Sequence, residues 1–191
     1  MSVLDAKQSK PFAGGPSFSL GNRVYRVVWA LVWLLFASWT PAPFHGWRRA
    51  LLSLFGADLA VGAHVYGSAR IWDPSKLTMG AYACIGRRVD CYSMGRISLG
   101  EYATVSQDAY LCAGSHDIDD PDFQLVTKPV VIGARAWIAA GAFVGPGVTI
   151  GEGAVLGARA VTFKDLQPWG VYVGNPAQLR RRRGRPEGSD S

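Results

Sequence analysis

The sequence predicts an all-β solenoid, a parallel β-helix of about five coils. The first observation is that Ile132 to Val161 divides into five consecutive hexads, IGARAW, IAAGAF, VGPGVT, IGEGAV and LGARAV, each opened by an aliphatic residue. The second is that Gly or Ala follows the opening residue, and the third is the abundance of glycine, with 23 in 191 residues. A period of six belongs neither to a helix nor to an ordinary strand, but it is typical of a parallel β-helix.

Each hexad is expected to supply one short strand and one corner, so that three hexads close a coil of roughly 18 residues. The opening aliphatic side chain points inward and stacks on its counterpart in the next coil. At the second place, glycine is expected to lower the cost of unusual backbone angles at the corner. The fifth place suits a narrow interior, with Ala136, Ala142, Val148, Ala154 and Ala160. One buried strand with Gly-rich loops, the alternative, would not keep phase over five units.

The repeat is expected to cover residues 58–167. It begins at Val61 and slips by two residues around Gly95, which predicts a widened corner. Over residues 113–130 the pattern is lost, and this stretch predicts a loop that leaves the solenoid. Functional residues tend to concentrate in such an insertion of a repeat protein.

The N-terminal part is expected to fold outside the repeat. Residues 1–22 are polar and contain Pro and Gly, which predicts a mobile arm. Residues 23–57 predict an apolar helical hairpin, whose first helix has a shorter apolar run than the roughly 20 residues that span a bilayer. One face of the second helix carries Trp47, Ala50, Leu51, Leu54 and Phe55, and the other carries Arg48 and Arg49.

Two interpretations of this hairpin remain open, and they do not exclude each other. The hairpin can cap the open end of the solenoid, because terminal coils need covering. Its apolar, aromatic surface with flanking arginines can also rest on a membrane, near lipid-linked substrates. The second interpretation predicts peripheral membrane contact through residues 23–56.

The charge and the cysteines limit the possible partners. The net charge of +6 comes largely from Arg180 to Arg183 and Arg185, in a closing segment and basic tail over residues 168–191. Because the basicity is local, a nucleic-acid partner is not expected. Cys84, Cys91 and Cys112 form no CxxC pair, which favours a reducing, cytoplasmic compartment, with the inner face of the membrane as an option. No spacing of metal ligands appears, so no metal is expected.

The chain has three histidines, and their settings differ. His45 and His64 are expected to be ordinary surface residues. His116 begins the insertion, beside Asp117. A histidine near its ordinary pKa is a natural general base for removing a hydroxyl proton at neutral pH. A carboxylate or a backbone carbonyl nearby could hold its tautomer.

Four features together carry a resemblance to a known family: the hexads, YLCAGSHD at 110–117, WIAAGAFVGPGVTIGEGAVLGARAV at 137–161 and VGNPA at 173–177. With them, about residues 20–183 resemble the left-handed β-helix acyltransferases. Within that family the chain is most similar to the colanic acid biosynthesis acetyltransferases, a branch of the maltose, galactoside and nodulation O-acetyltransferase group. The resemblance implies left-handed coils, a homotrimer with sites between subunits, acetyl-CoA as acyl donor and a sugar or glycan hydroxyl as acceptor.

The resemblance also implies roles for individual residues. His116 corresponds to the family's catalytic general base. The coenzyme cleft is implied at Trp137, at Ala140 and Ala158, where a bulky side chain would block the pantetheine arm, and at Lys164 and Arg181, near the CoA phosphates. The acceptor side is implied at Asp90, Tyr92 and Ser93. The chain departs from the family in having Ala139 and Ala140 where relatives often have Gly or Ser, and Ser93 where many have Asn. Trp137 could instead pack in the trimer interface.

Three alternatives to a sugar O-acetyltransferase remain open. An antibiotic O-acetyltransferase of the same fold would give no reason for the apolar hairpin. A γ-type carbonic anhydrase binds zinc through three histidines, but His64 and His116 are far apart and no other histidine closely follows His116. The last alternative is a trimeric scaffold without catalytic activity.

Overall fold

A β-solenoid with three parallel faces forms the body of the protein, in a computed structural model that describes residues 3–184. The first sheet contains β1 (Asp58–Leu59), β4 (Leu77–Met79), β7 (Ile97–Leu99), β12 (Val130–Ile132) and β15 (Thr149–Ile150). The second contains β2 (His64–Val65), β5 (Cys84–Ile85), β8 (Thr104–Val105), β13 (Trp137–Ile138), β16 (Val155–Leu156) and β18 (Gly170–Val173), with β19 (Gln178–Arg182) antiparallel at its edge. The third contains β3 (Arg70–Ile71), β6 (Asp90–Tyr92), β9 (Tyr110–Cys112), β14 (Phe143–Val144) and β17 (Val161–Thr162).

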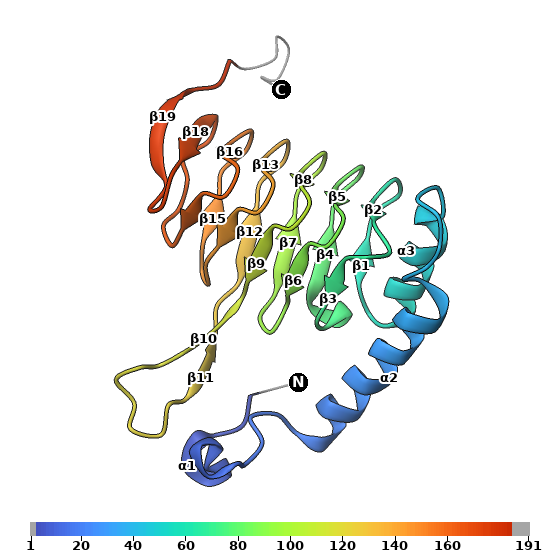
Figure 1. Ribbon diagram of the computed structural model, residues 1–191, viewed down its shortest axis with the longest axis vertical. Coiled ribbons are helices and arrows are strands. Elements are labelled where there is room, and N and C mark those ends of the chain that lie inside the picture. Colours follow the sequence, from blue (N-terminus) through green and yellow to red (C-terminus); the bar gives the residue numbers. More distant parts are fainter. Residues whose placement is uncertain (1–2, 185–191) are drawn as a thin grey trace.

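This architecture confirms the predicted β-helix, with a slightly larger number of coils. Five coils each place one strand in all three sheets, and a sixth, partial coil adds the bridge between Leu166 and Ile150 and strand β18. The coils stack from α3 (His45–Leu54) at one end to β18 and β19 at the other (Figure 1). The sequence predicts about five coils because the sixth has too few hexads to be recognised.

The core is a set of columns that run along the stack. In the second sheet, register places one aliphatic residue of each coil over the next, in the column Val65, Ile85, Val105, Ile138 and Leu156. Each of these side chains is almost fully buried. Burying one such side chain contributes about 1.5–3 kcal/mol, so repetition of the hexad accounts for most of the hydrophobic stabilisation.

The role expected for glycine at the second place of the hexad is wrong. Gly133 does not adopt a positive φ, but a Cβ there would lie 2.7 Å from the backbone nitrogen of Glu152 in the next coil. The positive φ falls at the fourth place, with 56° at Arg135, 66° at Gly141 and 57° at Arg159. Glycine at the second place therefore allows the coils to stack closely, and the turn itself is made two residues later.

Helix α3 covers the first coil, with a buried face that the sequence did not predict. Leu51 and Leu52 are buried, whereas Trp47 and Leu54 are exposed. Arg48 is fully buried, although it was assigned to the outer face. Its guanidinium donates to the carbonyl of Val65 in the edge strand β2 and to the carbonyls of residues 40–42 in the segment between the two helices. Those carbonyls explain why an arginine is stable inside the cap.

Helix α2 (Leu20–Phe36) lies against the first coil through two tryptophans. The indole of Trp29 donates to the Ile71 carbonyl at 2.7 Å, and that of Trp33 donates to the Gly67 carbonyl at 3.1 Å. The outer face of the helix is apolar and exposed, with Val24, Val27, Val28, Leu31, Leu34, Leu35 and Phe36. Among residues 3–184, no helix is both long and apolar enough to cross a membrane.

The insertion and the N-terminal arm pack against each other. The insertion forms an antiparallel hairpin of β10 (Gly114–His116) and β11 (Leu125–Thr127), and the arm contains α1 (Ala6–Ser9) and a 3-10 turn, Pro11–Ala13. A second 3-10 turn, Pro74–Lys76, precedes β4. Gln124 of the insertion accepts from the Ala6 amide at 2.7 Å and donates to the Leu4 carbonyl at 3.1 Å. Figure 1 shows α1 at the end of the hairpin that lies away from the coils. The sequence predicts a mobile arm, and the structure shows that this arm contacts the insertion.

Candidate active site

His116 ends strand β10 and is held by the other side of the insertion. Its Nδ1 lies 2.9 Å from the Phe123 carbonyl, and its ring stacks on the Phe123 ring with 4.2 Å between centroids. Because a carbonyl can only accept, Nδ1 carries the proton in this bond, and in the neutral imidazole Nε2 then holds the lone pair. Phe123 itself has a φ of 53°, a left-handed conformation unusual for a phenylalanine. The insertion thus orients the imidazole for proton transfer.

A cavity of about 420 Å³ opens on one side of His116. The arm contributes Phe18, α2 contributes Arg23 and Arg26, and the third sheet contributes Tyr92. No carboxylate is among the described residues that line it, so the cavity is positively charged. A second hollow of about 450 Å³, on the side of Lys128 and Phe163, is also lined by His116. His116 therefore faces two separate spaces.

Two of the three residues implied on the acceptor side face a cavity. Tyr92 lines the His116 cavity, and burial raises the pKa of its hydroxyl. Asp90 lies two residues earlier on β6, where burial raises its carboxyl pKa while Arg70, 3.7 Å away, lowers it. Ser93 is fully buried and points away from the cavities. Its Oγ accepts from the Asp73 amide at 2.9 Å and donates to the Asp73 carbonyl at 3.0 Å. Ser93 therefore stabilises a corner of the coil and does not contact the cavity space.

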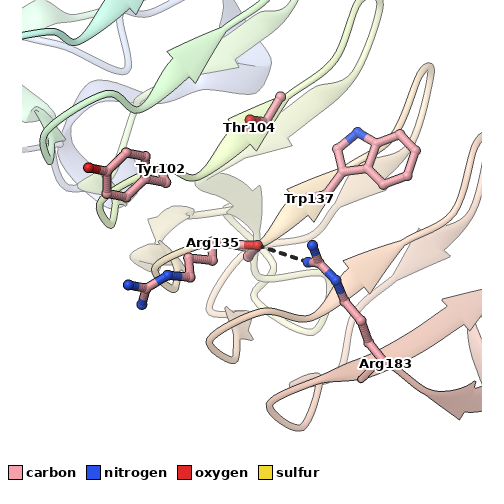
Figure 2. A pocket seen from close by; sticks show the side chains of 6 residues that line it. Tyr102, Thr104, Arg135, Trp137 and Arg183 are labelled. Carbon is pink, nitrogen blue, oxygen red and sulfur yellow. Dashed lines mark hydrogen bonds between the residues drawn. The ribbon is translucent and has the colours of Figure 1, made fainter. Parts of the chain in front are cut away.

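Trp137 lies on the second sheet, beside another surface hollow of about 670 Å³. The indole donates to the Ser106 hydroxyl at 2.9 Å and the side chain is 46% exposed. Arg183 lines the same hollow, and its guanidinium donates to the Arg135 carbonyl at 3.2 Å (Figure 2). It also donates to the Gly153 carbonyl at 3.2 Å. Arg181, the residue implied by the sequence, does not line this hollow. Sequence reasoning missed Arg183, and the arginine run was its only signal.

The other residues implied for the coenzyme cleft lie at corners of the solenoid. Ala140 and Ala158 occupy the same corner, between the second and third sheets, and the Arg159 amide donates to the Ala140 carbonyl at 2.9 Å. Lys164 is exposed at a different corner, after β17. Within one chain, Trp137, Ala140 and Ala158 lie on a different face and corner from the insertion that carries His116, whereas Lys164 lies at the corner between the third and first sheets from which the insertion also leaves. Arg185 of the predicted basic tail falls outside the described residues.

The remaining histidines lie at the first coil. His45 and His64 stack with 4.4 Å between ring centroids, and burial lowers the pKa of His45. His64 is exposed, whereas His45 is half-buried and contacts the Val65 carbonyl. Over residues 3–184, no group of three His, Cys, Asp or Glu side chains is placed to hold a metal ion.

Comparisons with known proteins agree with the resemblance. Residues 129–164 match the family model described as bacterial transferase hexapeptide (six repeats). The chain is 40% identical over 172 residues to the protein named colanic acid biosynthesis acetyltransferase WcaF from Escherichia coli K12, covering 90% of this chain and 94% of that protein. The chain belongs to the hexapeptide-repeat acetyltransferases.

Solved structures of hexapeptide-repeat acetyltransferases share the fold. A maltose O-acetyltransferase from Clostridium difficile 630 superimposes with a TM-score of 0.73 at 22% identity, covering 87% of this chain and 90% of that one. A hexapeptide-repeat acetyltransferase from Vibrio cholerae O1 biovar eltor, complexed with acetyl coenzyme A, gives a TM-score of 0.71 at 21% identity, covering 90% and 93%. These likenesses confirm the predicted left-handed β-helix class.

Proposed function

We propose that this hexapeptide-repeat acetyltransferase moves an acetyl group from acetyl-CoA to a sugar hydroxyl, with His116 as general base. The observation that carries the proposal is the hydrogen bond from His116 Nδ1 to the Phe123 carbonyl, which leaves Nε2 ready to accept a proton beside a cavity. The name of the Escherichia coli relative and the acetyl coenzyme A in the Vibrio cholerae structure support the donor and the reaction class.

The chemistry requires one base and good positioning. His116 Nε2 accepts the hydroxyl proton as the acceptor oxygen forms a bond to the thioester carbonyl carbon. The carbon–sulfur bond then breaks, and the imidazolium returns the proton to the leaving thiolate. Backbone amides of the coils would stabilise the oxyanion that forms in between. Because the thioester is already activated, holding the two substrates together supplies much of the remaining rate.

We further propose that the working unit is a homotrimer. His116 lies on the insertion, whereas Trp137, Ala140, Ala158 and Arg181 lie on other faces and corners of the same chain. One chain therefore does not surround a coenzyme with all of them. A neighbouring copy, presenting its second sheet to the insertion, would complete the cleft, and Arg183 would join Arg181 near the phosphates.

The test replaces His116 with alanine. The variant is expected to lose about 10²–10⁴-fold in kcat while binding CoA as the wild type does, measured by a coupled thiol assay and by calorimetry. His64→Ala is the matched control, because His64 is exposed on the first coil, and should keep full activity. Activity of His116→Ala within about tenfold of wild type would refute the base assignment. Absence of CoA binding in the wild type would favour the scaffold alternative.

The acceptor is proposed to be a sugar of an exopolysaccharide or of its lipid-linked precursor, acetylated in the cytoplasm. An antibiotic acetyltransferase of the same fold is the second candidate. Assaying the protein against sugar acceptors and against hydroxylated antibiotics separates them. A higher kcat/KM for antibiotics would reverse the assignment.

Contact of residues 23–56 with a membrane surface is proposed on the basis of the exposed apolar face of α2. No acidic residue lies between Asp5 and Asp58, so the face would meet anionic lipids without repulsion. The protein should float with phosphatidylglycerol-containing vesicles, and Leu31→Glu with Leu35→Glu should abolish this. Ile118→Glu, an exposed change on the insertion, is the control. Equal flotation of all three proteins would contradict membrane contact by α2.

A further inference from the structure

An apolar groove of about 620 Å³ runs between α2 and the outer face of the third sheet. Helix α2 lines it with Ala30, Trp33 and Leu34, and the sheet side lines it with Trp72 and Tyr110. The groove is therefore built from the first coils and from the helix that covers them, and most of its surface is aromatic or aliphatic.

The groove adjoins the His116 cavity, because Arg26 and Tyr92 line both spaces. The Tyr92 ring meets the Trp72 ring edge-on, with 5.9 Å between centroids. The guanidinium of Arg26 lies over the same Trp72 ring, 4.2 Å from its centroid. A cation thus marks the point at which the polar cavity passes into the apolar groove.

The Arg26 guanidinium has N–H groups at this junction that make no hydrogen bond to another described residue. Its Nε donates to the Asn22 side chain at 2.9 Å, and neither Nη atom makes a hydrogen bond to another described residue. Burial lowers the pKa of Arg26, so an anion beside it would offset a real desolvation cost. The second arginine of the cavity, Arg23, lies one helical turn earlier and is exposed.

No nearby carboxylate faces Arg23 and Arg26 from the His116 cavity. Asp73 interacts electrostatically with Arg26, but it is buried, and its Oδ1 accepts from the Ser75 amide and hydroxyl. Asp90 lies on the groove wall and pairs with Arg70. Neither carboxylate lines the His116 cavity.

We propose that the acceptor is a sugar joined through a phosphate to a hydrocarbon chain. The sugar hydroxyl lies at His116, the phosphate oxygens pair with Arg23 and Arg26, and the chain lies in the groove between α2 and the third sheet. This assignment rests on the proposed acetyl transfer, since His116 defines the sugar end. The order of cavity, cation and apolar groove matches the order of the three chemical parts of such an acceptor.

The test measures binding of a probe that carries the phosphate and the chain but no sugar. Farnesyl diphosphate should bind at least about tenfold more tightly than farnesol or inorganic pyrophosphate, in calorimetry with the full chain. Arg26→Gln should remove most of the difference between farnesyl diphosphate and farnesol, and Arg26→Lys should restore part of it. Inorganic pyrophosphate binding as tightly as farnesyl diphosphate would indicate a free-phosphate site and overturn the proposal.

A second variant tests the groove itself. Ala30→Trp places a large ring in the groove and should weaken farnesyl diphosphate binding by about tenfold. Leu31→Trp, the next residue and exposed outside the groove, is the matched control and should bind as the wild type does. Thermal melting of both variants establishes that they are folded. Unchanged binding to Ala30→Trp would place the chain elsewhere and overturn the proposal.

The two proposals fail in distinguishable ways. His116→Ala should bind farnesyl diphosphate normally while losing acetyl transfer. If the wild type acetylates a free sugar but does not bind the probe, the acceptor class is wrong and the acetyl transfer stands. If it binds the probe but neither binds nor consumes acetyl-CoA, the proposed function is wrong, and with it the acceptor role of the groove.

Discussion

In the coil stack one contact is repeated many times, whereas in the segments attached to it each contact is made once. Ile138 lies over Val105 and under Leu156, and the same kind of aliphatic contact recurs along all three faces. The hairpin cap depends instead on Arg48, and the arm on Gln124, each of which bonds to a particular set of backbone groups.

The coils therefore provide most of the stability, and the attached segments carry the residues proposed to act on substrate. The repeated contacts make a rigid support, because each coil contributes a similar apolar column. The groups proposed to act on substrate, His116 and Arg26, lie on the insertion and on α2, outside the regular coils. Single contacts can hold a side chain in one orientation without altering the repeat, so the attached segments are the part of the molecule in which function can diversify.

The largest expected effect is at a contact made once. Arg48 donates to the Val65 carbonyl at 2.6 Å, the Thr40 hydroxyl at 2.7 Å and the Ala42 carbonyl at 2.6 Å. Arg48→Met should lower the free energy of unfolding by about 3 kcal/mol, because several carbonyls lose their donor. Urea denaturation measures this. Arg49→Met is the control, since Arg49 makes no side-chain hydrogen bond to another described residue and should shift stability by less than about 0.5 kcal/mol. Equal effects of the two changes would contradict the role given to Arg48.

A change at a repeated contact of the coil stack should lower the stability by less than Arg48→Met does, and only where a neighbouring coil lies close. A Cβ on Gly133 would lie 2.7 Å from the Glu152 nitrogen and 2.9 Å from the Ile150 carbonyl oxygen. Gly133→Ala should destabilise the protein by about 2 kcal/mol, because the backbone at residues 150–152 of the next coil has to move. Gly46→Ala in α3 meets no atom within 4 Å and should stabilise by about 0.5 kcal/mol. If differential scanning calorimetry gave both changes the same sign, close stacking would not explain Gly133.

The same comparison explains what could be predicted from the sequence. The hexad period indicates the solenoid because every coil obeys one local rule, and His116 stood out as the single histidine of the insertion. The hexad does not indicate Ser93, whose burial depends on Asp73 in the coil before, where the phase is weak. A helical face assigned by polarity cannot reveal that Arg48 meets unpaired carbonyls.

The arginine run shows the same limit. The sequence alone cannot distinguish Arg181 from Arg183, because both lie in one run of arginines. The pairing of β19 with β18 decides which of the two side chains reaches the hollow beside Trp137. That pairing shifts register between Val171 and Tyr172, and Arg183 reaches the carbonyls of Arg135 and Gly153. The groove beside Arg26 could likewise not be predicted from the sequence, because it forms only when α2 lies across the third sheet.

The smallest expected effect on stability concerns the contact that joins the arm to the insertion. Gln124→Ala removes the bonds to Ala6 and Leu4 and should cost about 1 kcal/mol. Amide exchange of residues 4–6 should rise while exchange in the coils stays unchanged. Because Gln124 follows Phe123, which holds His116, kcat should fall more than the small loss of stability suggests, with little change in the KM for acetyl-CoA. Gln107→Ala, an exposed change on a coil corner, should alter neither quantity. Fast exchange of the arm with an unchanged kcat would show that the hairpin holds His116 without the arm.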